Sequence, residues 1–199
     1  MSGMPKLIDH DARRTQIAEA LWRVVLRSGA SGVSIRDVAA EAGISAGSLR
    51  HVFPTREALL EFSMLLIQER VGERVRAHTA VRDPLRRAEK ILAEVLPYDD
   101  ARRVEMHVNL ALVTDAAGRP GLEEISLGAH DGLRALCRAL LVDLRKHGLV
   151  HADRDVDDEA MHLHALIDGL AVHLLVGRTD PPAQVRRLVR GHLESLSAN

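Results

Sequence analysis

The chain has 199 residues, 28% of them charged and 46% hydrophobic, which is typical of a globular protein of one or two domains. Its 27 Lys and Arg nearly balance its 28 Asp and Glu, which excludes a protein that binds nucleic acid or an anionic membrane over its whole surface. The single cysteine excludes an internal disulfide and a zinc site built from thiolates. Neither an apolar stretch of membrane-spanning length nor a signal-peptide pattern is visible, so we expect a cytoplasmic protein.

The spacing of apolar residues predicts an all-α fold of about nine helices. Aromatic residues make up 2% of the chain, whereas Ala, Leu, Arg and Glu are abundant, which favours helices over strands. No segment alternates with a period of two over the length of a strand. In chain order, we expect helices at residues 11–28, 35–42, 45–52, 56–77, 85–96, 101–116, 121–147, 156–176 and 182–197.

Several of these helices begin at a side chain that is able to cap a helix. Ser34, with Asp37 three residues later, resembles a capping box, and Ser45 is a suitable N-cap for the helix that follows. Asp83 precedes Pro84, and proline is favoured at the first position of a helix. These local signals set the expected boundaries of the short helices.

Charge is distributed unevenly along the chain. Residues 1–56 have a net charge of +3 and residues 57–199 a net charge of −4. A mildly basic module before an acidic body fits an anionic partner at the N-terminal end, although a difference of this size also arises by chance. We expect a first domain at residues 1–55 and a second at residues 56–199.

Residues 34–53 have the pattern of a helix-turn-helix. Gly43 lies where the turn between the two helices needs a positive φ. Leu49, Val52 and Phe53 fall on one face of the second helix, which we expect to be buried. The opposite face carries Ala46, Gly47, Arg50 and His51. Small residues followed by hydrogen-bond donors suit a helix that enters the major groove of DNA.

Two other interpretations also fit this segment. Two short helices with a glycine turn also occur as a plain helical corner, which serves packing alone. Residues 43–47 also fit the G-x-S-x-G string of a hydrolase nucleophile elbow. That chemistry needs a strand before the serine, whereas a helix is expected there, so the hydrolase interpretation is disfavoured.

The stretch from Arg13 to Leu60 resembles the DNA-binding domain of TetR-family transcriptional regulators. The pattern that carries the resemblance is Ile35-Arg36-x-Val38-Ala39-x-x-Ala42-Gly43-Ile44-Ser45-x-Gly47-Ser48-Leu49, followed by Phe53-Pro54-x-Arg56-x-x-Leu59-Leu60. Residues 47–51 and the phrase Ala165-Leu166-Ile167-Asp168-Gly169-Leu170-Ala171 resemble the BetI-like branch of this family. Family members often carry aromatic residues where this chain has residues 50–52, and the usual lysine is replaced by Arg56.

The resemblance implies a homodimeric repressor that is released from double-stranded operator DNA by a small-molecule effector. The implied recognition residues are Arg36, Ser45, Ala46, Gly47, Ser48, Arg50 and His51. The implied phosphate contacts are Arg14, Thr15 and Arg56. An arginine such as Arg50 is able to make two hydrogen bonds to a guanine.

The helix expected at residues 156–176 is apolar on two faces, so we expect both faces to pack against other protein segments. One face suits its own domain, and the other suits the same helix of a second copy, since a helix-turn-helix protein gains a second half-site by dimerising. A central helix in a monomer is the alternative. The candidate pairing residues are Leu163, Ile167, Gly169, Leu170, Leu174, Val185, Leu188, Val189 and Leu196.

Polar residues within the apolar helices are candidates for an effector pocket, or alternatively are structural polar groups. They are Asn109, His130, His164 and Asp168. The histidines show no spacing that would collect the three or four ligands of a metal site, so we expect no metal and no cofactor. Aromatic cages bind choline, and too few aromatic residues lie outside the first domain to build one, so we expect that choline is not the effector.

Two other classes of protein compete with the DNA-binding regulator. An enzyme is disfavoured because no nucleophile–base pair, cofactor loop or metal set is visible in the sequence. A helical adaptor that uses its helix-turn-helix for packing is the third class. Affinity for duplex DNA that falls steeply with salt separates the regulator from the other two.

Overall fold

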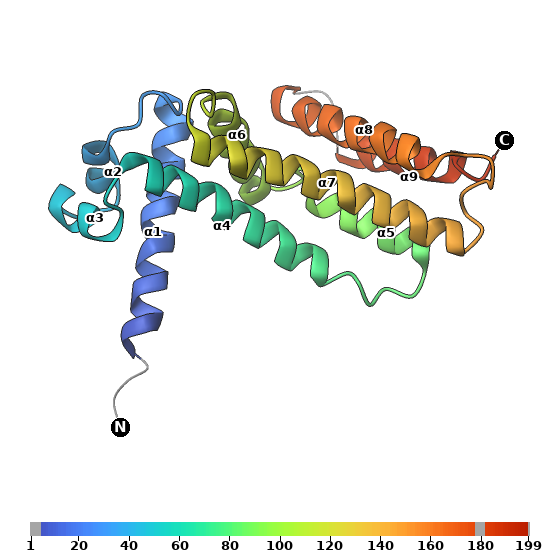
Figure 1. Ribbon diagram of the computed structural model, residues 1–199, viewed down its shortest axis with the longest axis horizontal. Helices are drawn as coiled ribbons and strands as arrows, with labels where there is room; N and C mark the ends of the chain where they lie inside the picture. Colours follow the sequence, from blue (N-terminus) through green and yellow to red (C-terminus); the bar gives the residue numbers. More distant parts are fainter. Residues whose placement is uncertain (1–4, 178–181, 199) are drawn as a thin grey trace. The chain divides into compact units, whose positions relative to one another are not determined.

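The computed structural model describes the backbone of residues 5–177 and 182–198. Within these ranges the regular elements are nine helices and no strands, which confirms the all-α fold (Figure 1). They are α1 (Pro5–Ser28), α2 (Ile35–Glu41), α3 (Ala46–Val52), α4 (Arg56–Arg76), α5 (Pro84–Glu94), α6 (Asp100–Thr114), α7 (Pro120–Lys146), α8 (Val156–Val176) and α9 (Pro182–Ser195).

The observed helix boundaries differ from the expected ones mainly at the first helix. α1 begins at Pro5 instead of residue 11, so the expected start is wrong. A proline is tolerated there because the first N–H groups of a helix have no acceptor within the helix. The bounds of α8 are the expected ones, and its N-cap Asp155 accepts from the backbone N–H groups of Asp157 and Asp158.

The other expected caps are also present. The Ser34 side chain accepts from the backbone N–H of Asp37, and the Ser45 side chain accepts from that of Ser48. Asp83 caps α5 through the N–H of Arg86. Each cap satisfies a backbone donor that would otherwise lack a partner at a helix N-terminus.

The chain forms two compact units. Unit 1 comprises residues 1–69 and 107–126, and unit 2 comprises residues 70–106 and 127–199. The helices α4, α6 and α7 therefore each contribute residues to both units. The domain boundary expected after residue 55 stays a prediction.

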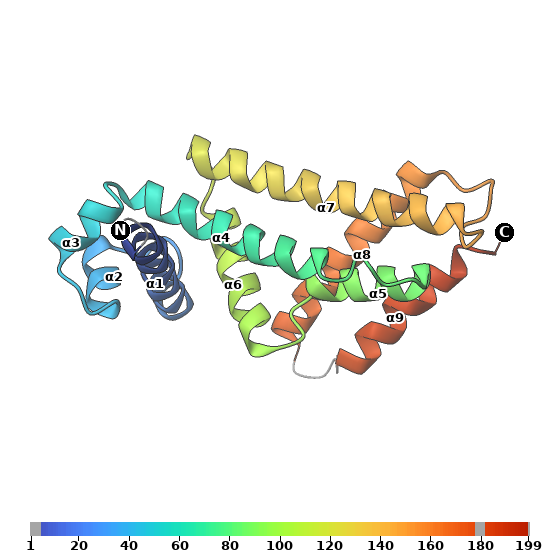
Figure 2. The ribbon, with the colours of Figure 1, turned by 90° about the horizontal axis from the view of Figure 1, so that it is seen from below.

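Unit 1 has a core in which α1 packs against the helix-turn-helix and the first half of α4. The α1, α2 and α3 helices lie close together in both ribbon views (Figure 2). Trp22 of α1 is buried, and its indole N–H donates to the hydroxyl of Ser63 on α4. The largest side chains that are fully buried in unit 1 are Ile17, Leu21, Leu49, Phe53, Leu59, Leu60, Met64, Leu112 and Leu122.

Unit 2 has its own core, to which α5, α7, α8 and α9 contribute. The α8 helix is central to it, because eight of its residues are buried. Among the described residues, α8 is also the one helix long and apolar enough to cross a membrane by composition. A buried core helix passes the same test, and its burial accounts for its composition. The buried members from α8 are Ala160, Leu163, His164, Ile167, Leu170, Ala171, Leu174 and Leu175.

Candidate nucleic-acid interface

The turn between α2 and α3 has the geometry of a helix-turn-helix. Gly43 has a φ of +67°, which confirms the predicted positive φ. A side chain there would strain the backbone, since the left-handed region favours glycine. The N–H of Ile44 donates to the carbonyl of Ala39 at 2.9 Å, which fixes the turn to the end of α2.

The inner face of α3 anchors the helix in unit 1. Leu49 is fully buried and Phe53, which caps the C-terminal end of α3, is 1% exposed. Val52 is half-buried. The face expected to be buried is thus the face that packs, and the rest of the helix is left for solvent or a partner.

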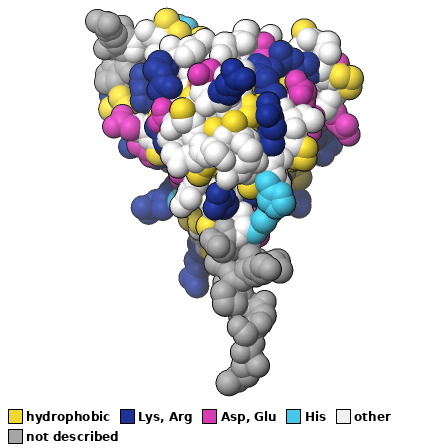
Figure 3. Space-filling model, turned by 90° about the vertical axis from the view of Figure 1, so that its left-hand side faces the viewer, with side chains coloured by type: hydrophobic (Ala, Val, Ile, Leu, Met, Phe, Trp, Pro, Cys, Tyr) yellow, Lys and Arg dark blue, Asp and Glu magenta, His cyan; other side chains and the backbone are white. Residues whose placement is uncertain are grey.

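The outer face of α3 presents small residues first and polar side chains in its last turn. Gly47, Arg50 and His51 are exposed, and Ala46 and Ser48 are half-buried. A Cβ added at Gly47 would meet only the hydroxyl of Ser45, at 3.7 Å, so the backbone is open to close approach. Figure 3 views the side on which α2 and α3 lie in Figure 1, and shows several Lys and Arg side chains spread over it.

Two of the three expected phosphate contacts are engaged within unit 1. Arg56 donates from Nε to the carbonyl of Val33 at 2.9 Å and from an outer nitrogen to that of Ala30 at 2.7 Å. Arg14 lies over aromatic rings, with its Cζ 4.2 Å from the ring centroid of Phe62. Thr15 is half-buried on α1, and Arg36 is exposed on α2. The Arg36 side chain is therefore exposed to solvent, whereas Arg14 and Arg56 already have partners inside the protein.

Asp115 is a residue of unit 1 that the sequence analysis missed. It accepts from the hydroxyl of Ser31 at 2.9 Å and lies 3.6 Å from the guanidinium of Arg56. It also pairs with Arg119, four residues later in the sequence. The residue directly after α6 is thus tied to the loop between α1 and α2. No local pattern signals this contact, because its partners are remote in the sequence.

Three of the four candidate effector residues come together in unit 2. The rings of His130 on α7 and His164 on α8 are 4.7 Å apart between centroids. Nε2 of His164 lies 3.3 Å from a carboxylate oxygen of Asp168. Burial lowers the pKa of His164, and the nearby Asp168 carboxylate opposes part of that change. Asn109 belongs to unit 1 and so is not part of this cluster.

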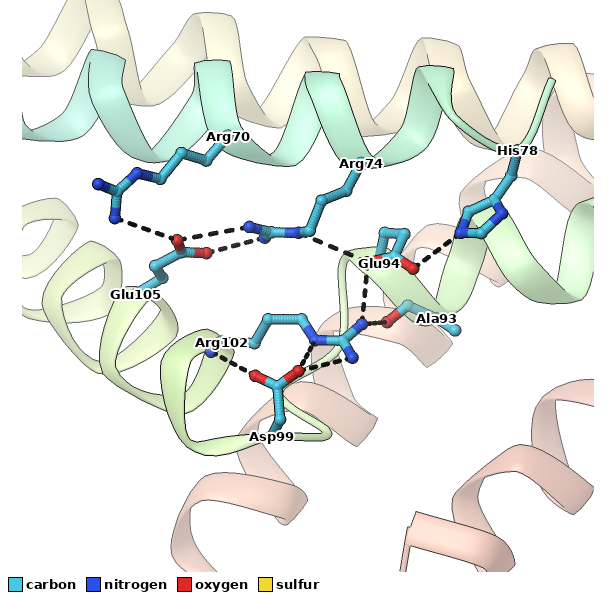
Figure 4. Close-up of polar contacts among 8 residues, drawn as sticks. All are labelled: Arg70, Arg74, His78, Ala93, Glu94, Asp99, Arg102 and Glu105. Carbon is cyan, nitrogen blue, oxygen red and sulfur yellow. Dashed lines mark hydrogen bonds and ion pairs between the residues drawn. The ribbon is translucent and has the colours of Figure 1, made fainter.

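A second polar cluster, also missed from the sequence, joins α4, α5 and α6 in unit 2 (Figure 4). The carboxylate of Glu105 is 5% exposed and accepts from Arg74 at 2.8 Å, with Arg70 at 3.8 Å. Glu94 pairs with Arg74, Arg102 and His78. The buried Glu105 and the half-buried Glu94 therefore each have at least two cationic neighbours, which offsets the cost of removing their charges from water. Within the described residues, no group of three or more His, Cys, Asp or Glu is placed to hold a metal ion.

Most of the candidate pairing residues are buried within unit 2, and their role in pairing stays a prediction. Six of the nine are at most 4% exposed in the single chain. These six are Leu163, Ile167, Leu174, Val185, Val189 and Leu196. Leu170 is 9% exposed, whereas Leu188 is 50% exposed. Gly169 and Leu188 line an apolar groove of about 290 Å³ between α8 and α9.

Comparisons with known proteins agree with this architecture. Residues 17–61 match the family model of bacterial regulatory proteins of the tetR family, and residues 84–198 match that of the BetI-type transcriptional repressor C-terminal domain. The chain is 41% identical to the HTH-type transcriptional regulator PksA of Bacillus subtilis (strain 168), over 97% of this chain and 94% of that protein. It is 28% identical to the regulator BetI of Paraburkholderia xenovorans, over 84% of each chain.

Solved structures give the same result for the fold. A transcriptional regulator from Rhodococcus sp. Rha1 superposes with a TM-score of 0.79 at 28% identity, over 92% of this chain and 95% of that one. A regulator from Saccharomonospora viridis in complex with choline superposes with a TM-score of 0.78 at 26% identity, over 93% and 95%. The chain therefore belongs to the TetR family of DNA-binding transcriptional regulators, in the branch with a BetI-type C-terminal domain.

Proposed function

We propose that this DNA-binding regulator is a cytoplasmic homodimeric repressor that reads its operator with α3 and leaves it when a small molecule binds unit 2. The observation that carries the proposal is the division of α3 into two faces. Leu49 and Phe53 hold the helix in unit 1, while Gly47, Arg50 and His51 are exposed. The alternative of an enzyme or adaptor is not favoured, because the relatives are transcriptional regulators.

The chemistry of the exposed face supports reading of the major groove. Bare backbone at Gly47 lets α3 approach the base edges closely. The Arg50 side chain then has the length and the paired donors to bind the N7 and O6 atoms of a guanine. Exposed Arg36 on α2 supplies a positive charge for a phosphate, as in other helix-turn-helix proteins whose first helix crosses the backbone.

The groove between α8 and α9 supports pairing through this surface, which we call the α8/α9 face. Leu188 and Val172 are 50% and 44% exposed, and Val176 is 79% exposed. Large apolar side chains gathered on a surface favour a protein partner over solvent. Gly169 lacks a side chain at the groove, so a second α8 is able to approach closely.

The cluster of His130, His164 and Asp168 is the proposed polar part of the effector site, with a purely structural role as the alternative. Choline is bound by the regulator from Saccharomonospora viridis, so it needs separate consideration for this chain. Tyr98 is the single Phe, Trp or Tyr of unit 2. The Arg186 guanidinium lies 4.7 Å from the centroid of its ring. A quaternary ammonium would have to displace this arginine and would find no second ring, so we maintain that choline is not the effector.

A DNA-binding assay tests the proposal. Duplexes that bind the protein are selected from a random pool, and the affinity for the selected operator is compared with that for random duplex at several salt concentrations. We expect preference for the operator and an affinity that falls steeply with salt. The same operator affinity for Arg50→Ala and the wild-type protein would contradict reading by α3.

A further inference from the structure

Arg14 stacks on two phenylalanines that belong to different helices. Its Cζ lies 4.2 Å from the ring centroid of Phe62 on α4 and 5.3 Å from that of Phe53, which caps α3. The two rings are 5.2 Å apart between centroids and inclined by 45°. One guanidinium from α1 thus closes a cluster that joins α1, α4 and the C-terminal end of α3.

The stacking replaces ordinary hydrogen bonding at part of this side chain. Nε of Arg14 is buried and has no hydrogen-bond acceptor among the described residues. A planar guanidinium is favoured over the faces of aromatic rings, and the attraction grows when the pair is removed from water. The position of Arg14 is therefore accounted for by the two rings, without a phosphate.

Phe53 connects this cluster to the residues that face DNA. Its backbone N–H donates to the carbonyl of Leu49 at 2.8 Å, which closes the last turn of α3. Arg50 and His51 lie in that turn. A shift of the Phe53 ring would therefore also move the last turn of α3, which carries Arg50 and His51.

We infer that Arg14 is a positioning residue, which sets the C-terminal end of α3 through Phe53 and Phe62 and so determines how Arg50 and His51 meet the base edges. The inference rests on the proposed reading of DNA by α3. It also departs from the expectation that Arg14 contacts a phosphate, and the two roles have different consequences. A phosphate contact strengthens binding to every sequence alike, whereas a positioning residue acts on the discrimination between sequences.

The experiment compares Arg14→Ala, Arg14→Lys, Phe62→Leu and the double variant Arg14→Ala/Phe62→Leu. Arg13→Ala is the matched control, because Arg13 is the exposed neighbour on α1 and carries the same charge. Affinity is measured for the selected operator and for random duplex, at several salt concentrations and well below the melting temperature of each variant. Circular dichroism verifies that each variant is folded.

We expect Arg14→Ala to weaken operator binding about tenfold, equivalent to about 1.4 kcal/mol. Binding to random duplex and the salt dependence should change no more than in Arg13→Ala. Phe62→Leu should weaken operator binding in the same way, and the double variant should lose less than the product of the two single losses. Arg14→Lys should recover only part of the loss, because an ammonium lacks the planar face.

Three results would overturn the inference. Full operator affinity in Arg14→Lys, together with equal losses on both duplexes in Arg14→Ala, would make Arg14 a phosphate contact. If the loss of operator affinity in the double variant equals the product of the two single-variant losses, Arg14 does not act through Phe62. A lower melting temperature with unchanged operator preference would make the cluster purely structural. If Arg50→Ala also leaves operator binding intact, the proposed reading by α3 is at fault instead.

Discussion

The carboxylate of Asp115 lies 3.6 Å from the guanidinium of Arg56, the first residue of α4. Because the same guanidinium donates to the carbonyls of Ala30 and Val33, this ion pair links the end of α6 to the loop between α1 and α2. Asp115 and Arg56 are both largely buried, with side-chain exposures of 13% and 19%. The loop that leads into the helix-turn-helix is therefore held from α6 as well as from α4.

We expect Asp115→Ala to lower the free energy of unfolding by about 1–3 kcal/mol, because it leaves partly buried donors without their acceptor. Ser31→Ala removes a single hydrogen bond to the same carboxylate and should cost about 1 kcal/mol or less. Urea denaturation of both variants provides the measurement. Equal stability of Asp115→Ala and the wild-type protein would show that the ion pair contributes nothing.

Arg50→Ala should reduce the affinity for the operator by about 1–3 kcal/mol and relax the preference at one base pair. The reason is that one arginine is able to pair with one guanine through two hydrogen bonds. Binding to a set of operators with single base-pair changes provides the measurement. A uniform loss over the whole set would mean that Arg50 contacts the DNA backbone.

Gly47→Glu should abolish operator binding and leave the helical circular dichroism unchanged. A new Cβ at this position would make only an ordinary contact with the Ser45 hydroxyl, at 3.7 Å, so the fold accepts the side chain, but a carboxylate there would meet the phosphates and bases of DNA. Gly47→Ala is the matched control and should retain most of the binding. Operator binding by the glutamate variant would exclude this face of α3 from the interface.

Gly169→Arg should weaken a dimer formed through the α8/α9 face, because a charged side chain would be buried there without a partner. The position is open in the isolated chain, and so is Gly132 on α7, which lies outside the groove. Sedimentation of the wild-type protein, Gly169→Arg and the control Gly132→Arg provides the measurement. A wild-type monomer at micromolar concentration would contradict the pairing model, and a dimer that survives Gly169→Arg would place the interface elsewhere.

The free energy of unfolding should fall as the pH is lowered below 7. Burial lowers the pKa of His164 from its usual 6.5, and burial also lowers the pKa of His192. A histidine whose pKa is lowered by folding binds protons more readily in the unfolded chain. Its contribution to the free energy of unfolding is therefore fully present above its pKa in the unfolded chain, and is lost as the pH falls towards its pKa in the folded chain. The neighbours of His164 include His130 and Arg134, whose charges act in the same direction, and Asp168, which opposes them.

Urea denaturation at a series of pH values between about 5 and 8 measures this effect, a range that spans the ordinary histidine pKa. His164→Gln should show a shallower decline than the wild-type protein. His147→Gln, a change at an exposed histidine, is the control for the loss of an imidazole. Identical slopes for His164→Gln and the wild-type protein would show that His164 does not titrate differently in the folded and unfolded chains.

Local features of the chain could be predicted from the sequence because they depend on neighbours a few residues apart. The caps at Ser34 and Ser45 and the turn at Gly43 are of this kind, and they suffice to define α2 and α3. The observed start of α1 at Pro5 is not predicted from the sequence, because residues 5–10 lack the apolar period that marks the remainder of the helix.

Features that depend on distant partners could not be predicted. An arginine looks the same in sequence whether it faces solvent, as Arg36 does, or a ring, as Arg14 does. The link between Ser31 and Asp115 has no local signal either. In α8 both faces are apolar, so the pattern does not tell which stripe enters the core. Leu163 and Ile167, two of the candidate pairing residues, are at most 1% exposed in the single chain.

The cap at Ser45 has a further consequence for how this protein meets DNA. Its hydroxyl is hydrogen-bonded to both the backbone N–H and the hydroxyl of Ser48, at 3.0 Å each, so the first turn of α3 is complete in the free chain. The entropy of ordering this helix is therefore lost during folding and not on association. Under the proposed reading by α3, the helix binds the operator without first having to fold, and we expect most of the selectivity to arise from the few side chains that project from it.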